Sequence, residues 1–155
     1  MKTEQGVRLD EVDKSILRFL SEDARASYRE IAKKLKLSPS TPFFRVRKMR
    51  KEKVLLGFAP LINFEKLGWD FTIITLLKVH GGHLEEVEEA IAKIPNVYAV
   101  YDITGDWDAL LVAKFRSRAE LNKFVKSLLS MPHVERTCTH TVLNTVKEKL
   151  VGGPI

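Results

Sequence analysis

Several features are scarce in this 155-residue chain, and each scarcity excludes a class of protein. The single cysteine, Cys138, excludes an internal disulfide framework and a zinc site built from cysteines. The longest apolar runs fall far short of the roughly 20 residues of a membrane-spanning helix, and the first ten residues are too polar for a secretory signal peptide. We therefore expect a soluble cytoplasmic protein with one domain or two small ones.

Motifs of catalysis are also missing. No serine or cysteine has the context of a nucleophile elbow. The sequence also has no glycine-rich phosphate-binding loop, since Gly152-Gly153 lies in the tail. The four histidines, His80, His83, His133 and His140, lack metal-ligand spacing, so no metal site is expected. The sequence predicts neither a cofactor nor enzymatic activity.

What the chain does contain is positive charge concentrated at one end. Residues 1–60 carry 15 Lys/Arg and 8 Asp/Glu, whereas residues 61–155 carry 11 and 12. A basic segment joined to a near-neutral one is typical of a nucleic-acid-binding module attached to a second domain. We therefore expect double-stranded DNA as a partner of the first segment.

Residues 1–53 predict three short helices. Asp10 is a good N-cap for an amphipathic helix that ends near Glu22. Ser27 and Glu30 have the spacing of a capping box at the start of a second helix. The tight connection from the second helix to the third is the pattern of a helix-turn-helix motif, whose third helix enters the DNA major groove.

The third predicted helix runs to about Glu52, and two starts are possible. Either Ser38 is the N-cap with Pro39 in the first position, or Thr41 is the N-cap with Pro42 in the first position. Proline fits the first position because it has no N–H to lose there. The sequence does not choose between these starts.

The third helix is the most basic stretch of the chain, with six Lys/Arg within residues 45–53. In a recognition helix the first side chains meet bases and the later cations meet phosphates. For the two phenylalanines, packing against the second helix or a partner subunit is an equal alternative to contact with thymine methyl groups. The predicted contacts to bases or to the nearest phosphates are Ser38, Ser40, Thr41, Phe43 and Phe44, and the predicted contacts to the DNA backbone are Arg45, Arg47 and Lys48.

Residues 54–70 predict a hinge, in which Leu56–Phe64 can add an edge strand to a partner chain. Residues 71–150 alternate strand and helix in the order βαββαβ, and residues 151–155 form a tail. This order predicts a ferredoxin-like α+β sandwich with strands at 71–79, 97–104, 109–115 and 133–146. Two helices would cover one sheet face, and the apolar residues of the other face favour a second subunit.

One turn, Thr104–Asp108, is a candidate small-molecule site. Its glycine lets a ligand carboxylate approach backbone amides, and nearby aspartates can hold an ammonium group. Threonines that alternate along the last strand can supply hydroxyl groups near the same edge. A plain hairpin turn and a solvated threonine row are the alternative. The candidate effector-binding residues are Tyr101, Asp102, Thr104, Gly105, Asp106, Trp107, Asp108, Thr139 and Thr141.

From about Leu9 to Lys149 the chain resembles the Lrp/AsnC (feast/famine) family of transcription regulators. The resemblance implies a helix-turn-helix domain, a β-strand hinge and a C-terminal amino-acid-response domain. It also implies homodimers paired through the sheets of that domain, assembly into octamers of four dimers, and an amino-acid effector bound near the glycine turn. The motifs that carry it are Asp10-x-x-Asp13-x-x-Ile16-Leu17, Ala24-Arg25, Glu30-Ile31-Ala32, Leu37-Ser38, Thr41, Arg45-Val46, Gly57-Phe58 and Thr104-Gly105-Asp106-Trp107-Asp108.

Two positions depart from the family pattern. Pro42 stands where the family usually has an aliphatic residue. The family also usually has a glycine near the position of Lys53, at the end of the recognition helix. Either Lys53 adopts a left-handed conformation or the helix continues. The expected function is a sequence-specific transcription regulator modulated by an amino acid or a related metabolite. The alternatives are an effector-free architectural DNA-binding protein and an amino-acid-sensing subunit of a metabolic enzyme.

Overall fold

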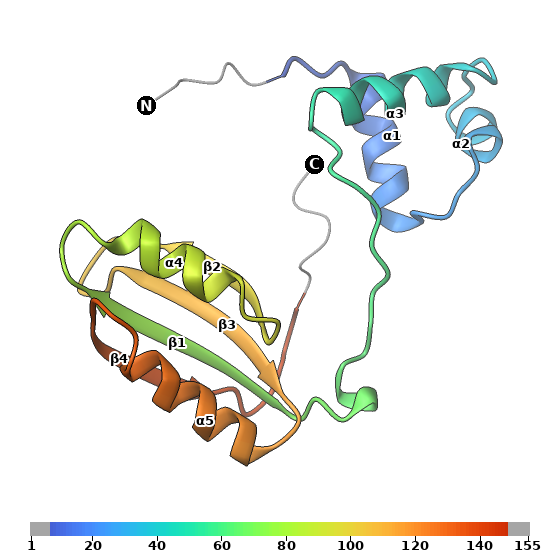
Figure 1. The fold of residues 1–155 in the computed structure, drawn as a ribbon. Helices are drawn as coiled ribbons and strands as arrows, with labels where there is room; N and C mark the ends of the chain where they lie inside the picture. The colour runs from blue at the N-terminus through green and yellow to red at the C-terminus, as the bar shows by residue number, and fades with distance from the viewer. Residues whose placement is uncertain (1–6, 149–155) are drawn as a thin grey trace. The chain divides into compact units, whose positions relative to one another are not determined.

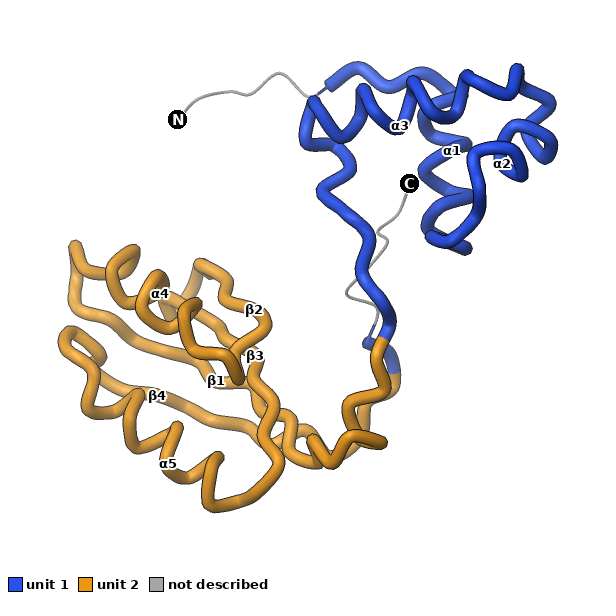
Figure 2. Tube along the Cα trace, turned by 45° about the vertical axis from the view of Figure 1, so that its right-hand side comes forward, with its two compact units in different colours: residues 1–61, 147–155 blue, residues 62–146 orange. Residues whose placement is uncertain are grey.

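The computed structural model describes residues 7–148 of the chain. The chain divides into two compact units, residues 1–61 with 147–155 and residues 62–146 (Figure 2). The boundary at residue 61 lies inside the predicted hinge, residues 54–70. The predicted tail, residues 151–155, lies outside the described residues.

The first unit contains the three predicted helices, α1 (Glu11–Glu22), α2 (Tyr28–Lys34) and α3 (Thr41–Lys51) (Figure 1). At the start of α1, the Asp10 carboxylate accepts the Asp13 backbone N–H at 2.8 Å. The Asp13 carboxylate in turn accepts the Asp10 N–H at 3.2 Å. Asp10 is therefore the N-cap that the sequence predicted, and Asp13 completes a capping box.

The capping box predicted for α2 is confirmed. The Ser27 hydroxyl accepts the Glu30 N–H at 3.2 Å, and the Glu30 carboxylate accepts the Ser27 N–H at 2.7 Å. A buried cluster then holds the three helices together. Its fully buried side chains include Ile16 of α1, Ile31 of α2 and Met49 of α3.

The start of α3 differs from both predicted alternatives. Ser40 is the N-cap, without a side-chain capping bond, and Thr41 is the first helical residue. Pro42 occupies the first turn, where a missing N–H leaves no intrahelical bond unmade. The helix does start late, as the second alternative predicted, although that alternative placed the N-cap at Thr41, one residue too far along the chain. The N-cap predicted at Ser38 was wrong.

Lysines in the left-handed conformation follow α2 and α3. Lys53 has a φ of 56°, so of the two alternatives left open by the sequence the left-handed conformation is the one observed. Lys36 has a φ of 53° in the turn between α2 and α3, which the sequence analysis did not anticipate. The adjacent Leu37 N–H donates to the Ala32 carbonyl at 2.8 Å, so this turn is bonded to the end of α2.

The edge strand predicted for Leu56–Phe64 would pair with a partner chain and stays a prediction. Within this one chain, residues 54–70, all of which the structure describes, contain no strand. A strand needs a hydrogen-bonding neighbour, and within this one chain the segment pairs with none. The segment contains only a short 3₁₀ helix, η1 (Glu65–Leu67), which Gly68 ends at a φ of 77°. Leu56 and Leu61 remain more than four-fifths exposed.

The second unit confirms the predicted βαββαβ order. Its antiparallel sheet has the strand order β2-β3-β1-β4, so β1 and β3 are central. The second and fourth strands are shorter than predicted, because the chain turns away from the sheet after each of them. The elements are β1 (Phe71–Val79), α4 (Leu84–Ala92), β2 (Val97–Asp102), β3 (Ala109–Phe115), α5 (Arg118–Leu129) and β4 (Val134–Thr141).

Both helices of this unit cover the same face of the sheet (Figure 1). Alternate residues of β1, such as Ile73 and Leu77, are fully buried beneath Ile91 of α4 and Leu128 of α5. The side chains between them point to the other face, which neither helix covers. That open face carries the half-buried apolar side chains Ile74, Leu76, Leu110 and Val112.

The caps of the first unit generate a stability prediction. Replacement Ser27→Ala removes an observed capping bond and should lower the free energy of unfolding by about 1 kcal/mol. Ser40→Ala is the matched control, since Ser40 is an N-cap without a side-chain capping bond, and it should be nearly neutral. Urea titration followed by circular dichroism measures both. Equal losses in the two variants would contradict this account.

Candidate DNA-binding and effector sites

One side of α3 is packed into the first unit, and the other side is exposed. Val46 and Met49 are buried among the helices. The exposed side chains are Phe43, Phe44, Arg47, Lys48, Arg50 and Lys51. We call these six residues the outer face of α3. It combines aromatic rings near the start of the helix with cations farther along, which is the order that a recognition helix needs.

The aromatic rings of the outer face pack on one another and stay accessible. The rings of Tyr28 and Phe43 meet edge to face with centroids 5.8 Å apart, and those of Phe43 and Phe44 lie 5.3 Å apart. Phe43 therefore packs against α2, which is one of the alternatives that the sequence left open. It nevertheless remains 44% exposed and Phe44 remains 60% exposed, so contact with thymine methyl groups stays available.

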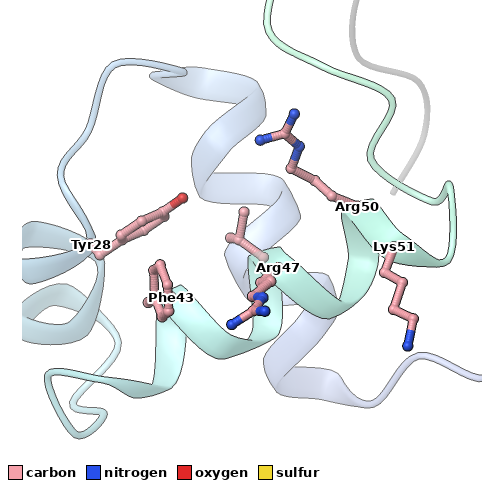
Figure 3. A pocket seen from close by; sticks show the side chains of 6 residues that line it. Tyr28, Phe43, Arg47, Arg50 and Lys51 are labelled. Carbon is pink, nitrogen blue, oxygen red and sulfur yellow. The ribbon is translucent and has the colours of Figure 1, made fainter.

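A shallow pocket lies between the start of α2 and the outer face of α3 (Figure 3). Tyr28 and Phe43 form its aromatic wall, and Arg47, Arg50 and Lys51 line it with cationic side chains. Within residues 7–148, none of these three cations makes an ion pair with a carboxylate. Their charges are thus available to an external anion such as a DNA phosphate.

The polar residues before α3 lie where the sequence placed them, at the entry to the recognition helix. Ser38 and Ser40 are exposed. The hydroxyl groups of Ser38 and Thr41 are 2.6 Å apart and share a hydrogen bond. This bond fixes two of the predicted contact residues relative to one another.

Arg45 has a different position from the other cations of α3. Its guanidinium group donates to Asp10 at 2.6 Å and lies 3.3 Å from the buried carboxylate of Asp13. The Asp10 carboxylate raises the pKa of Arg45. The Asp13 backbone N–H, followed by Arg45, lowers the pKa of Asp10. Arg45, expected at the DNA backbone, is bonded instead to the N-terminus of α1 and fixes α3 against it.

The predicted effector residues do not converge within one chain. β2 and β4 lie at opposite edges of the sheet, so two strands separate Tyr101 and Asp102 from Thr139 and Thr141. The expectation that these residues share an edge is therefore wrong for a single chain. The Thr139 hydroxyl also bonds to that of the buried Thr75 at 3.0 Å.

The residues that end the predicted turn have structural partners. The Asp108 carboxylate accepts the Lys78 ammonium group and the Val79 N–H, each at 2.8 Å. Lys78, followed by the Val79 N–H, lowers the pKa of Asp108. The Arg136 guanidinium lies 4.7 Å from the Trp107 ring centroid. These contacts fasten the turn to β1 and β4 and leave its first half available.

The first half of the turn is open to solvent. Thr104, Gly105 and Asp106 are exposed, and Gly105 has a φ of 117°, which other residues rarely adopt. Tyr101 and Asp102 precede the turn on opposite faces of β2, because successive strand residues alternate. Asp102 points toward the helix-covered face and Tyr101 toward the open face.

Sequence reasoning missed Glu88 of α4. Its Oε1 is shielded from solvent and has no hydrogen-bond partner among the described residues. Burial, followed by the charges of Asp102 and Glu85, raises the pKa of Glu88. The signal was in the spacing, since Glu88 follows the half-buried Leu84 by four residues and so lies on the same side of the helix.

Comparison with known protein families identifies the domains in which these two candidate sites lie. Residues 9–50 match the AsnC-type helix-turn-helix domain, and residues 72–151 match the Lrp/AsnC ligand binding domain. The chain belongs to the Lrp/AsnC family. It is a transcriptional regulator with a DNA-binding domain and a ligand-binding domain, as the resemblance implied.

Relatives of this Lrp/AsnC regulator match over nearly its whole length. An HTH-type transcriptional regulator from Pyrococcus furiosus is 46% identical over 142 residues, 92% of this chain and 96% of the relative. A regulator from Neisseria meningitidis, solved in complex with L-Met, has 26% identity and a TM-score of 0.86, and the match covers 94% of this chain and 97% of that one. AsnC from E. coli shares the fold at 22% identity, with a TM-score of 0.86 and coverage of 94% and 99%.

Among the described residues of this Lrp/AsnC protein, no helix combines the length and apolar character needed to cross a membrane. The helix-turn-helix match, residues 9–50, lies within its first unit, and most of the ligand-binding match, residues 72–151, lies within its second unit. The outer face of α3 lies in the helix-turn-helix match, and the Thr104–Asp108 turn lies in the ligand-binding match.

The contacts of Asp108 generate a pH prediction. A lowered pKa means that the ionised carboxylate stabilises the folded state above its ordinary value of 3.8 and that this contribution is lost as the pH falls through the folded value. Asp108→Asn should therefore lower the melting temperature at pH 7, with the difference from wild type shrinking in acid. Asp106→Asn, in the exposed part of the turn, is the control and should change neither. A constant difference at every pH would contradict a role for the charge.

Proposed function

We propose that the chain is a sequence-specific regulator that binds double-stranded DNA as a homodimer or higher homo-oligomer and responds to an amino acid or a related metabolite. It acts in the cytoplasm and has no enzymatic role. The observation that carries the DNA-binding part is the outer face of α3. There Arg47, Arg50 and Lys51, which have no carboxylate partner among the described residues, follow two exposed aromatic rings. The ligand-binding part rests on the family match of the second unit.

In this proposal the start of α3 reads the DNA sequence and its later turns hold the backbone. Exposed hydroxyl and aromatic side chains at a helix N-terminus suit base edges and thymine methyl groups. Arginine and lysine suit phosphates. The contacts to bases or nearest phosphates are Ser38, Ser40, Thr41, Phe43 and Phe44, and the contacts to the backbone are Arg47 and Lys48. Arg45 is a positioning residue, because its guanidinium group is engaged by α1.

The open face of the sheet supports the proposal of homodimerisation. Ile74, Leu76, Leu110 and Val112 form an apolar patch that neither helix of the chain covers. A second copy of the same face would bury this patch, as in a β-sandwich. The exposed hinge residues Leu56 and Leu61 add apolar surface that a partner strand can cover. Four such dimers would form the octamer that the resemblance implies, and a two-fold axis predicts a pseudo-palindromic DNA site.

The effector proposal rests on the related Neisseria regulator, whose structure contains L-Met. In this chain the available part of the turn, Thr104 to Asp106, offers backbone amides for a ligand carboxylate. The carboxylates of Asp102 and Glu88 lie close enough for the charge of Asp102 to raise the pKa of Glu88. Such a negative region suits the ammonium group of an amino acid. Thr139 and Thr141 can join this site only from a second copy.

The DNA interface is tested by the salt dependence of binding. Arg47→Ala should weaken binding and reduce the slope of log K against log salt by about one unit, because one phosphate contact is lost. Arg45→Ala should leave the slope unchanged and lower the melting temperature instead. Fluorescence anisotropy at several salt concentrations measures the slopes, with Lys126→Ala on α5 as the control. An unchanged slope for Arg47→Ala would remove Arg47 from the interface.

The effector is tested by thermal shift against the twenty amino acids and their keto-acid relatives. A ligand at 100 times its Kd should stabilise the chain by about 2.7 kcal/mol. Asp106→Ala should reduce the shift, whereas Asp70→Ala, an exposed aspartate of the hinge, should not. No hit at millimolar concentration would favour the effector-free architectural protein. Competition with random DNA then decides that alternative, which predicts little sequence preference.

A further inference from the structure

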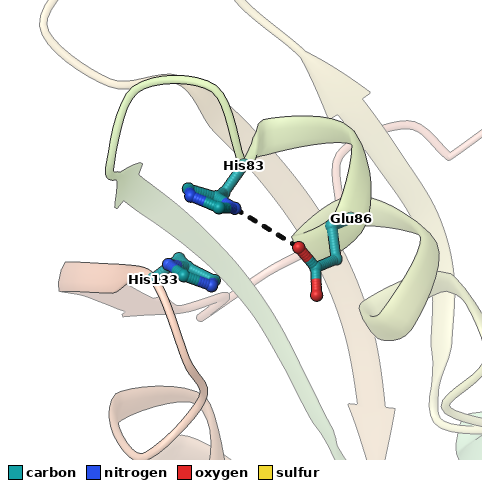
Figure 4. A group of neighbouring side chains, drawn as sticks. All are labelled: His83, Glu86 and His133. Atoms are coloured by element: carbon teal, nitrogen blue, oxygen red, sulfur yellow. Dashed lines mark hydrogen bonds and ion pairs between the residues drawn. The ribbon is translucent and has the colours of Figure 1, made fainter.

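Two histidines far apart in the sequence meet at one end of the second unit. His83 precedes α4, and His133 precedes β4. Their imidazole rings lie parallel, with centroids 3.6 Å apart and planes inclined by 2° (Figure 4). Glu86, in the first turn of α4, places Oε2 3.3 Å from Nδ1 of His83. Neither the spacing nor the local sequence predicted this cluster.

The backbone holds the two histidines in place. The His80 N–H donates to the His133 carbonyl at 2.9 Å, and the His83 N–H donates to the His80 carbonyl at 3.2 Å. The turn before α4 is thus bonded directly to the turn before β4. His133 has a φ of 67°, a left-handed conformation that is uncommon for residues other than glycine and that persists where the surroundings hold it. The cluster is therefore set on two connected turns.

We propose that His83, Glu86 and His133 form a binding site for a divalent transition-metal ion of the zinc class. One ligand atom from each residue lies within 4.8 Å of the other two. Two imidazole nitrogens and a carboxylate oxygen form a donor set that Zn²⁺ accepts, with a further position left for water. His80 is outside this set, because its Nδ1 already lies 2.9 Å from Glu135.

The stacked arrangement indicates how an ion would enter. The lone pairs of two parallel imidazoles point side by side, whereas ligands of a tetrahedral ion converge on it. The rings must therefore fan apart when the ion binds, and the stack is lost. The half-buried position of both histidines leaves room for this rotation at the surface.

A bound ion would connect α4 to the chain segment that enters β4. It would add a second link to the backbone bond between the same two turns. Because the ligands come together only in the folded chain, binding should raise the melting temperature. This site is independent of the proposed effector, since its donor set recognises a cation rather than an amino acid.

One other pair of metal-ligating groups competes for the same ion. Sγ of Cys138 and Nε2 of His140 lie 3.3 Å apart on β4. A thiolate and an imidazole also bind Zn²⁺. The experiment must therefore assign the ion to one of the two places.

Titration of the metal-stripped full chain with Zn²⁺ alone, followed by calorimetry, tests the proposal. We expect one ion per chain and at least a tenfold weaker affinity in His83→Asn and in His133→Asn. Asparagine is a favourable N-cap residue at position 83, where His83 makes no side-chain capping bond, and it tolerates the left-handed conformation at position 133. Glu86→Gln should weaken binding as well. His140→Asn and Cys138→Ser are the matched controls and should bind as the wild type does.

A second measurement keeps the test independent of folding. Co²⁺ in place of Zn²⁺ should give the visible absorption of a nitrogen and oxygen site without the near-ultraviolet band of a cobalt–thiolate bond. Circular dichroism of every variant confirms that it folds. Absence of binding in the wild type, binding that survives in the His83→Asn/His133→Asn double variant, or loss of binding in Cys138→Ser would each overturn the proposal.

Discussion

The central position of β1 is the constraint on which the second unit depends. Because β1 pairs with β3 on one side and β4 on the other, its side chains alternate between a face under two helices and a face without them. Residues such as Ile73 and Leu77 hold the helices, and Ile74 and Leu76 form the apolar patch on the open face. One strand therefore builds the core and the surface proposed to join two copies.

In the first unit a comparable constraint falls on Arg45. A cation on a basic helix is expected to face DNA, yet the two carboxylates at the start of α1 bind this one. Asp13 is buried, so removing the guanidinium group would leave its carboxylate with little solvent and with only the Asp10 N–H as a partner. The buried charge of Asp13 therefore stabilises this position of Arg45. It also gives α3 a fixed orientation, with the remaining cations directed outward.

The sequence predicted the elements well where local chemistry decides them. The cap at Asp10 and the capping box at Ser27 each depend on a few neighbouring residues, and each was found. The left-handed Lys53 was one of two alternatives that the sequence left open. The spacing of apolar residues likewise predicted β1 and β3 with their observed bounds. The hinge strand stays a prediction, because its expected partner is a second chain and a strand needs a hydrogen-bonding neighbour.

The sites were harder to predict because they depend on contacts between distant segments. No local pattern shows that Arg45 forms an ion pair with Asp10, or that Lys78 forms one with Asp108. The stacking of His83 on His133 is equally invisible in the local sequence. The expected closeness of the effector residues was wrong for a similar reason, because it depends on the order of the strands in the sheet. The βαββαβ order was predicted, but the consequence that β2 and β4 form opposite edges was not drawn from it.

That separation of the edges links ligand binding to assembly. Within one chain, β3 and β1 separate β2, which leads into the Thr104–Asp106 turn, from Thr139 and Thr141 on β4. In the effector site proposed above, these threonines therefore come from a second copy. A ligand bound there would contact the assembled state and not the separate chains, so it would stabilise the assembly by an amount set by its concentration relative to its Kd. In such an arrangement the effector would act on DNA binding through the spacing of the recognition helices that assembly sets, without any contact to the helix-turn-helix unit.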